Sequence, residues 1–228
     1  MSRFQAQGLK YGFVTALMSA LSPAVAQEVV YRETFPVPEG EALKLTEAGW
    51  QAWVYSTGDR KVHRGAAGYS ELMRPNPSQP GPMEPVASGA AEDAATTGML
   101  VNWNGGTFWP NPTLYVTNEF KLDDASRLHS VSWFQNNQGE KGGFRLVLRV
   151  GTTWIASDEN HVGFLNVDQS IADTRWRFFN TANLAPDPEA TMDTLPEGEI
   201  EWIGVFGEHT GYAELDNFTI KVNPPATD

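Results

Sequence analysis

The chain has 228 residues, with 28 acidic against 16 basic side chains and a formal net charge of −12. This balance argues against nucleic-acid binding, which needs basic clusters to neutralise phosphates, and it disfavours anionic membrane surfaces for the same reason. Cysteine is absent, which excludes disulfides, thiolate metal sites and cysteine nucleophiles.

Residues 1–27 have the composition of a secretory signal peptide. Arg3 and Lys10 give a positive start, residues 11–21 an apolar centre, and residues 24–26 a small-residue cleavage site. The apolar centre is shorter than the roughly 20 residues that span a bilayer. A structural helix is the alternative, which the lack of acidic residues in this segment disfavours. We expect a secreted or periplasmic monomer without membrane insertion.

Short segments rich in β-branched and aromatic residues recur along the mature chain, separated by turn residues. This pattern predicts an all-β, two-sheet antiparallel β-sandwich of the jelly-roll type. We expect one domain over residues 28–222, followed by a disordered tail at 223–228. The predicted strands cover residues 29–35, 50–55, 99–103, 114–120, 128–135, 144–150, 153–157, 175–179, 200–206 and 210–222.

Residues 56–97 differ in composition, because Gly, Pro, Ala and Ser dominate. A connection of this length in a compact domain is functional or poorly ordered. We expect an insertion or long loops, with short strand pieces around Val62 and residues 71–73. A polar, glycine-rich hairpin loop is expected at residues 136–143.

Both ends of the domain carry an acidic residue inside an apolar strand pattern. Glu33 lies in the first predicted strand, and Asp216 with Asn217 interrupts the alternation of the last. Such oxygen-bearing groups are costly to bury without a partner. A hard cation between the two strands would hold both charges. The alternative is a surface pair that ends a strand.

These residues also carry a resemblance. Residues 33–35 (ETF) and 213–220 (AELDNFTI) resemble the two ends of secreted bacterial β-jelly-roll modules of the laminin-G-like or concanavalin-like type. Residues 130–137 and 148–158 resemble the same group, so the likeness spans most of the mature chain. Many carbohydrate-binding modules share that architecture. The resemblance implies a structural calcium ion held by Glu33 and Asp216, with Asn217 as a further ligand.

A candidate saccharide-binding face lies on the strand at residues 144–150. Its side chains alternate across the sheet, so that Arg145 and Arg149 share one face. Aromatic rings and guanidinium groups together can stack on a sugar ring and bind a carboxylate or sulfate. The alternative is that the tryptophans belong to the core and the arginines are solvated or paired with acids. The candidate ligand residues on this and neighbouring strands are Arg145, Arg149, Trp133, Trp154, Arg175 and Arg177.

A second candidate is the glycine- and proline-rich stretch that contains Trp103 and Trp109. Aromatic residues on loops are explained less readily by core packing than those on strands. The alternative is a loop held in place by its own aromatic side chains. A polysaccharide or extracellular glycan is the expected partner of either candidate.

Catalysis is the weaker interpretation. Residues 197–201 place three glutamates at every second position, as laminarinase-type glycoside hydrolases do, but without the intervening Asp of those enzymes. A lyase would need a His or Tyr base with Arg or Gln; His129, Gln135 and Tyr212 supply the types without a motif. The sequence thus predicts an exported, non-catalytic glycan-binding or matrix-recognition module, with a small polysaccharide lyase or glycoside hydrolase as the alternative and a structural cell-surface module as a further one.

Overall fold

The computed structural model describes residues 27–35, 43–56, 58, 60–64, 72–75, 98–103, 111–137, 143–209 and 212–225. The predictions for the signal peptide, for most of the 56–97 segment, for Trp109 and for the end of the tail lie outside these residues. No helix in the described part of the chain is long and apolar enough to cross a membrane.

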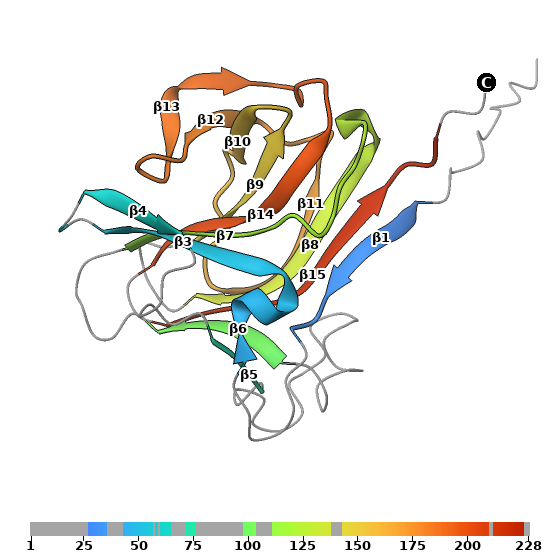
Figure 1. Cartoon of the computed structure of the whole chain (residues 1–228). Helices are drawn as coiled ribbons and strands as arrows, with labels where there is room; N and C mark the ends of the chain where they lie inside the picture. Colours follow the sequence, from blue (N-terminus) through green and yellow to red (C-terminus); the bar gives the residue numbers. More distant parts are fainter. Residues whose placement is uncertain are drawn as a thin grey trace, which may run out of the picture.

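Two antiparallel sheets pack face to face, which confirms the predicted β-sandwich (Figure 1). The first, a seven-stranded sheet over the described residues, contains in spatial order β11 (Phe164–Ser170), β8 (Leu128–Asn137), β15 (Tyr212–Val222), β6 (Gly98–Trp103), β5 (Leu72–Pro75) and β2 (Leu43–Lys44), with β1 (Glu28–Glu33) paired to β15. The second, an eight-stranded sheet, contains β13 (Ala185–Met192), β12 (Trp176–Asn180), β10 (Thr153–Ser157), β9 (Phe144–Val150), β14 (Ile200–His209), β7 (Asn111–Thr117), β3 (Trp50–Ser56) and β4 (Lys61–Arg64).

The core between the sheets is aromatic and closely packed. Trp50, Trp133 and Trp176 are fully buried there. The ring of Phe218 lies 5.1 Å from Trp50 and 6.4 Å from Trp133, measured between centroids. Large aromatic side chains contribute heavily to burial of apolar area, so this core stabilises a chain that has no disulfides.

Regular alternation decides which side chains enter this core. In β9, Leu146 and Leu148 face the core, whereas Arg145 and Arg149 are only half-buried on the opposite face. The prediction for this strand is confirmed. In β3 the same alternation places Trp50 in the core and Trp53 on the outer face.

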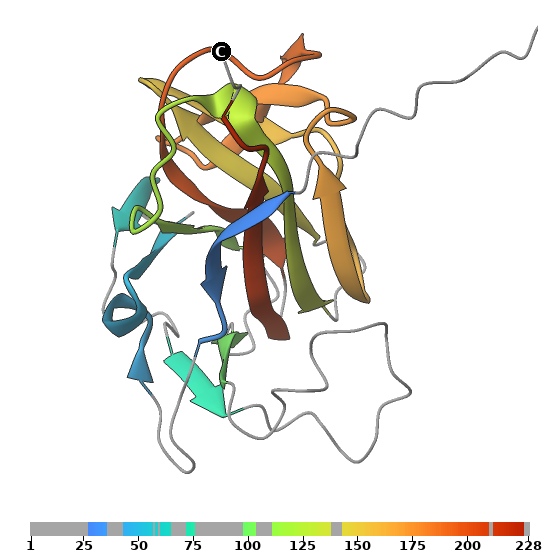
Figure 2. The ribbon, with the colours of Figure 1, turned by 90° about the vertical axis from the view of Figure 1, so that its right-hand side faces the viewer.

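The two ends of the domain lie side by side, as predicted. Strand β1 lies antiparallel beside β15 (Figure 2). The register places Glu33 opposite Phe218. Asn217 has a positive φ of 51° and lies within a register shift between Asp216 and Thr219 on the β8 side. The interrupted alternation of the sequence is therefore a β-bulge, which re-aims the side chains around it.

One predicted connection is wrong. Residues 136–143 do not close a hairpin, because β8 pairs with β11 and β15, whereas β9 pairs with β10 and β14 in the other sheet. The segment instead links the two sheets. The strands that the sequence did not predict are β2, β11 and β13.

Candidate functional site

The outer face of the eight-stranded sheet, the one turned away from the seven-stranded sheet, carries a second apolar cluster. The three tryptophans of this cluster come from different strands: Trp53 from β3, Trp154 from β10 and Trp202 from β14. Each stands next to a residue that faces the other way, such as Ile155 beside Trp154 and Ile203 beside Trp202. Strand alternation alone thus directs all three rings to this face.

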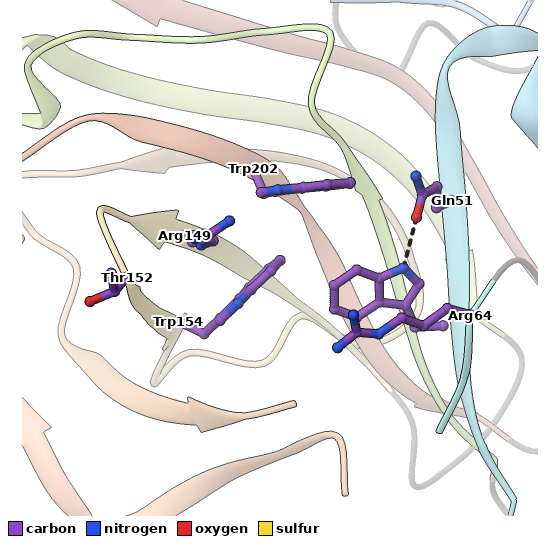
Figure 3. Close-up of a pocket in the computed structure, with 7 residues that line it drawn as sticks. Gln51, Arg64, Arg149, Thr152, Trp154 and Trp202 are labelled. Atoms are coloured by element: carbon purple, nitrogen blue, oxygen red, sulfur yellow. Dashed lines mark hydrogen bonds between the residues drawn. The ribbon is translucent and has the colours of Figure 1, made fainter. Parts of the chain in front are cut away.

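A pocket of about 400 Å³ opens beside these rings. This volume falls within the roughly 300–1,000 Å³ of small-molecule sites. Apolar rings and polar side chains line it together (Figure 3). Its lining residues are Gln51, Trp53, Arg64, Arg149, Thr152, Trp154 and Trp202.

The three tryptophans pack against one another in one aromatic cluster. The centroid of Trp53 lies 5.3 Å from that of Trp154 and 5.8 Å from that of Trp202, and the last two are 6.3 Å apart. These are contact distances for aromatic pairs. The rings therefore stabilise one another by direct contact. Trp154 and Trp202 are both partly exposed.

Arg149 lies between two of the rings, because its register partners are Trp154 on β10 and Trp202 on β14. Its Nη1 is 2.7 Å from Glu201 Oε2, with the two side chains 31% and 35% exposed. An ion pair at this exposure contributes at most about 1 kcal/mol. Its main effect is to orient the guanidinium of Arg149 beside the pocket.

The opposite side of the pocket is built on the β3–β4 pair. Arg64 is the register partner of Trp53, and its guanidinium carbon lies 4.1 Å from the centre of that ring. Trp53 Nε1–H donates to Gln51 Oε1 over 3.1 Å. In this bond the amide oxygen of Gln51 is the acceptor, so its NH₂ group is not used by Trp53 (Figure 3). The turn between β9 and β10 adds the exposed hydroxyl of Thr152.

This combination suits binding rather than proton transfer. Trp154 and Trp202, both partly exposed, offer apolar ring area to ring C–H groups, whereas Trp53 is only 4% exposed and packs against them. Arg64, Arg149 and Gln51 offer N–H donors to oxygens. None of the described residues that line the pocket is an Asp, Glu, His or Tyr, the side chains that act as general acids or bases most often.

The structure divides the candidate ligand residues predicted from the sequence. It brings Arg149 and Trp154 together in the pocket. Trp133 is 1% exposed in the core between the sheets, where its Nε1–H donates to Gln135 Oε1 over 2.9 Å. It does not reach the outer face, because β8 belongs to the other sheet.

The remaining three arginines lie away from the pocket lining and have protein partners. Arg145 donates to the carbonyl oxygens of Ser157 and Asp158, and burial lowers its pKa. Arg177 Nε is 2.5 Å from Asp158 Oδ1. Arg175 pairs with Asp193 at 3.2 Å. These contacts hold strands β9, β10, β12 and β13 together.

The second candidate, the stretch around Trp103 and Trp109, is only partly described. Trp103 ends β6 opposite Tyr212 in the seven-stranded sheet, so its backbone belongs to the other sheet from the pocket. Trp109 lies outside the described residues.

The predicted calcium ligands lie on the paired strands at the domain ends. Glu33 Oε1 accepts from the Phe35 amide over 2.6 Å, and burial raises the pKa of Glu33. Asp216 is 3% exposed, and its Oδ1 accepts from the Asn217 amide over 2.6 Å. Asn217 Oδ1 in turn accepts from Arg32. No three His, Cys, Asp or Glu residues of the described part gather as a metal-binding group, whereas the two carboxylates and one amide are oxygen donors of the kind calcium takes.

Sequence reasoning did not find Gln51, Trp53, Arg64, Thr152 and Trp202. A signal was present for the two tryptophans, since each is out of phase with the core-facing residues of its own strand. For Arg64 and Thr152 there was none, because they reach the pocket only through the pairing of β3 with β4 and the turn after β9.

The fold and the pocket together define a class: a β-sandwich with an aromatic, arginine-flanked pocket on its outer face. Comparison of the chain with protein-family models, with curated proteins and with solved structures finds no match. Any function therefore has to follow from the chemistry of the pocket itself.

Proposed function

We propose that this protein binds a saccharide unit of an extracellular glycan in the pocket formed by Trp53, Trp154 and Trp202. The observation that carries this proposal is the tryptophan cluster in which Trp154 and Trp202 remain partly exposed, beside a pocket of about 400 Å³ with N–H donors on two sides. A pyranose presents ring C–H groups on its face and hydroxyl groups on its edge, which matches apolar rings flanked by polar groups.

A purely structural role for the three rings is less well supported. The core between the sheets is complete without them, since they belong to a separate cluster. Trp154 and Trp202 also remain partly exposed beside a pocket, and pockets lined by aromatic rings with a few polar groups are typical of binding sites.

An aromatic cage for a quaternary ammonium ion fits less well than a sugar platform. A cage needs a gap between ring faces for the cation, and these rings contact one another directly. The positive charge of Arg64 would also repel a cationic ligand.

Export and calcium belong to the same proposal. An exported protein meets polysaccharides and millimolar calcium, and the signal-like residues 1–27 support export. Glu33, Asp216 and Asn217 would hold the ion at the paired chain ends, about the β15 bulge. There the ion would stabilise the fold and take no part in glycan binding.

Calorimetric titration with soluble oligosaccharides tests the proposal. Truncation of a stacking ring, Trp154→Ala or Trp202→Ala, should weaken binding about tenfold or more, since one aromatic contact contributes on the order of 0.5–1.5 kcal/mol beyond the area it buries. Phe178→Ala is the matched control, because Phe178 is 45% exposed on the same sheet but does not line the pocket.

Equal affinities of the wild type and both tryptophan variants would remove the pocket from the proposal. The same samples should be followed by absorbance for unsaturated uronate products. Product formation would favour the lyase alternative instead.

A further inference from the structure

The two arginines at the pocket differ in how their charge is compensated. Arg149 is paired with Glu201 at 2.7 Å, so the pair carries no net charge. Arg64 lies on the face of Trp53, and no carboxylate of the described residues forms an ion pair with it. One uncompensated positive charge therefore stands at the pocket, in a chain whose net charge is −12.

Stacking also sets the direction in which Arg64 can bind. Because one face of the planar guanidinium rests on the Trp53 ring, its N–H groups remain free along the edge of the plane. That edge matches the two oxygens of a carboxylate, or two oxygens of a sulfate, in a bidentate pair. Contact with the ring restricts the side chain beforehand, which reduces the entropy lost on binding.

The overall negative charge of the protein does not cancel this local effect. Charges in solution are largely screened beyond about 8 Å at physiological ionic strength. The groups at the pocket therefore determine the charge that a ligand meets there. Of these, Gln51 and Thr152 are neutral and suit hydroxyl groups, and Arg149 is already neutralised by Glu201. Arg64 is the group left for an anion.

We infer that the saccharide recognised here carries an acidic group, a carboxylate or a sulfate, and that Arg64 is the residue that selects it. This inference rests on the proposed function and specifies its ligand class. The partly exposed rings of Trp154 and Trp202 bind the sugar ring whether or not it is charged. Arg64 adds a charge-assisted pair that only an acidic sugar can complete.

Matched ligand pairs separate the two contributions. The probes are an oligogalacturonate and its methyl ester, and a sulfated galactan oligosaccharide and its desulfated form. Each pair keeps the ring and removes the charge. We expect the acidic member of at least one pair to bind about tenfold or more tighter, as hydrogen bonds to charged groups allow, and the difference to shrink at high salt. The pair that shows it identifies carboxylate or sulfate as the group recognised.

The decisive variant is Arg64→Gln, which keeps a planar donor and removes the charge. It should abolish most of the preference for the acidic member, because it weakens binding of the acidic member about tenfold more than binding of the neutral member. The control is Arg60→Gln, which removes the same charge from the exposed turn before β4, outside the pocket lining. Glu201→Gln should act in the opposite direction, because it releases the charge of Arg149, and should raise the affinity for the acidic member several-fold.

Each result has a definite meaning. If the acidic and neutral members bind equally, or if Arg64→Gln weakens both alike, the inference is overturned while saccharide binding stands. If none of the four probes binds to the wild type, both the inference and the proposed function are overturned. Thermal melting of each variant separates loss of recognition from loss of folding.

Discussion

The tryptophans of this molecule occupy two kinds of environment, the core and the outer face, as Trp133 and Trp154 illustrate. Trp133 is fully buried, stacks on Phe218 at an interplanar angle of 25° and donates to Gln135. Trp154 packs against the rings of Trp53 and Trp202 on the outer face and remains partly exposed. The first is a stability residue, and the second is available to a ligand.

Substitution of Trp133 by Ala should therefore lower the free energy of unfolding by about 3–5 kcal/mol, as is usual when a large core aromatic is removed. Trp154→Ala should cost clearly less stability while it weakens saccharide binding. Urea denaturation of both variants measures the difference. Equal losses would mean that the outer cluster is as important to the fold as the core.

His161 gives the protein a pH-dependent stability. Burial lowers the pKa of His161, and the nearby Glu159 opposes this shift only in part. The unfolded chain then takes up a proton near pH 6.5, before the folded protein does. Stability should fall as the pH decreases from about 6.5 toward the lowered folded pKa and become constant with respect to this group below it.

The variant His161→Gln should flatten the stability curve in that pH window, with His129→Gln as the control histidine. Unfolding free energies measured between pH 5 and pH 8 would show this. A slope unchanged by His161→Gln would assign the pH dependence to other groups.

Two residues of the pocket were predicted from the sequence, and the others were missed for a physical reason. Arg149 and Trp154 were predicted because alternation along β9 and β10 is regular. Trp133 was predicted with them although it lies in the core. The pattern of a strand tells which residues share a face, but the face that becomes the interior depends on the sheet that the strand joins.

At the scale of elements, the central strands were predictable and the edges were not. Strands β9 and β10 match their predictions to the residue. In β9 the core-facing positions are uniformly apolar. Strand β13 contains Pro186 and Pro188, which argue against a strand in sequence yet are tolerated at a sheet edge, where one side of the backbone has no ladder to complete. Strand β11 is likewise an edge strand with polar residues at alternate positions.

The paired strands β1 and β15 carry the calcium prediction. Addition of a chelator should lower the melting temperature of the wild type, since an ion that binds only the folded state stabilises it by mass action. Glu33→Gln and Asp216→Asn should melt lower and lose their response to chelator. Glu28→Gln, an exposed substitution on the same strand, should respond as the wild type does.

If the melting temperature in excess chelator equals that in added calcium, the prediction of a structural ion is contradicted. The pairing of the chain ends would remain, because backbone hydrogen bonds of β1 and β15 hold it.

At the scale of the whole molecule, the eight-stranded sheet is unusual in having apolar clusters on both faces. One face closes the sandwich and the other forms the tryptophan surface. The fold class followed from composition and strand spacing, because many short amphipathic strands have few ways to bury one face each. The pocket could not be predicted in this way, because its residues come from β3, β4, β9, β10 and β14. The order of these strands in the sheet differs from their order in the chain.

The arrangement of the termini has a mechanical consequence. Glu28 pairs with Val222, so the first and last strands leave the domain at the same end of their shared ladder. Tension applied between the two termini would open that ladder one residue pair at a time, as a zipper opens, and would not load its hydrogen bonds together in shear. A sandwich tethered at both ends would yield at low force, whereas one attached through a single terminus would leave this ladder unloaded.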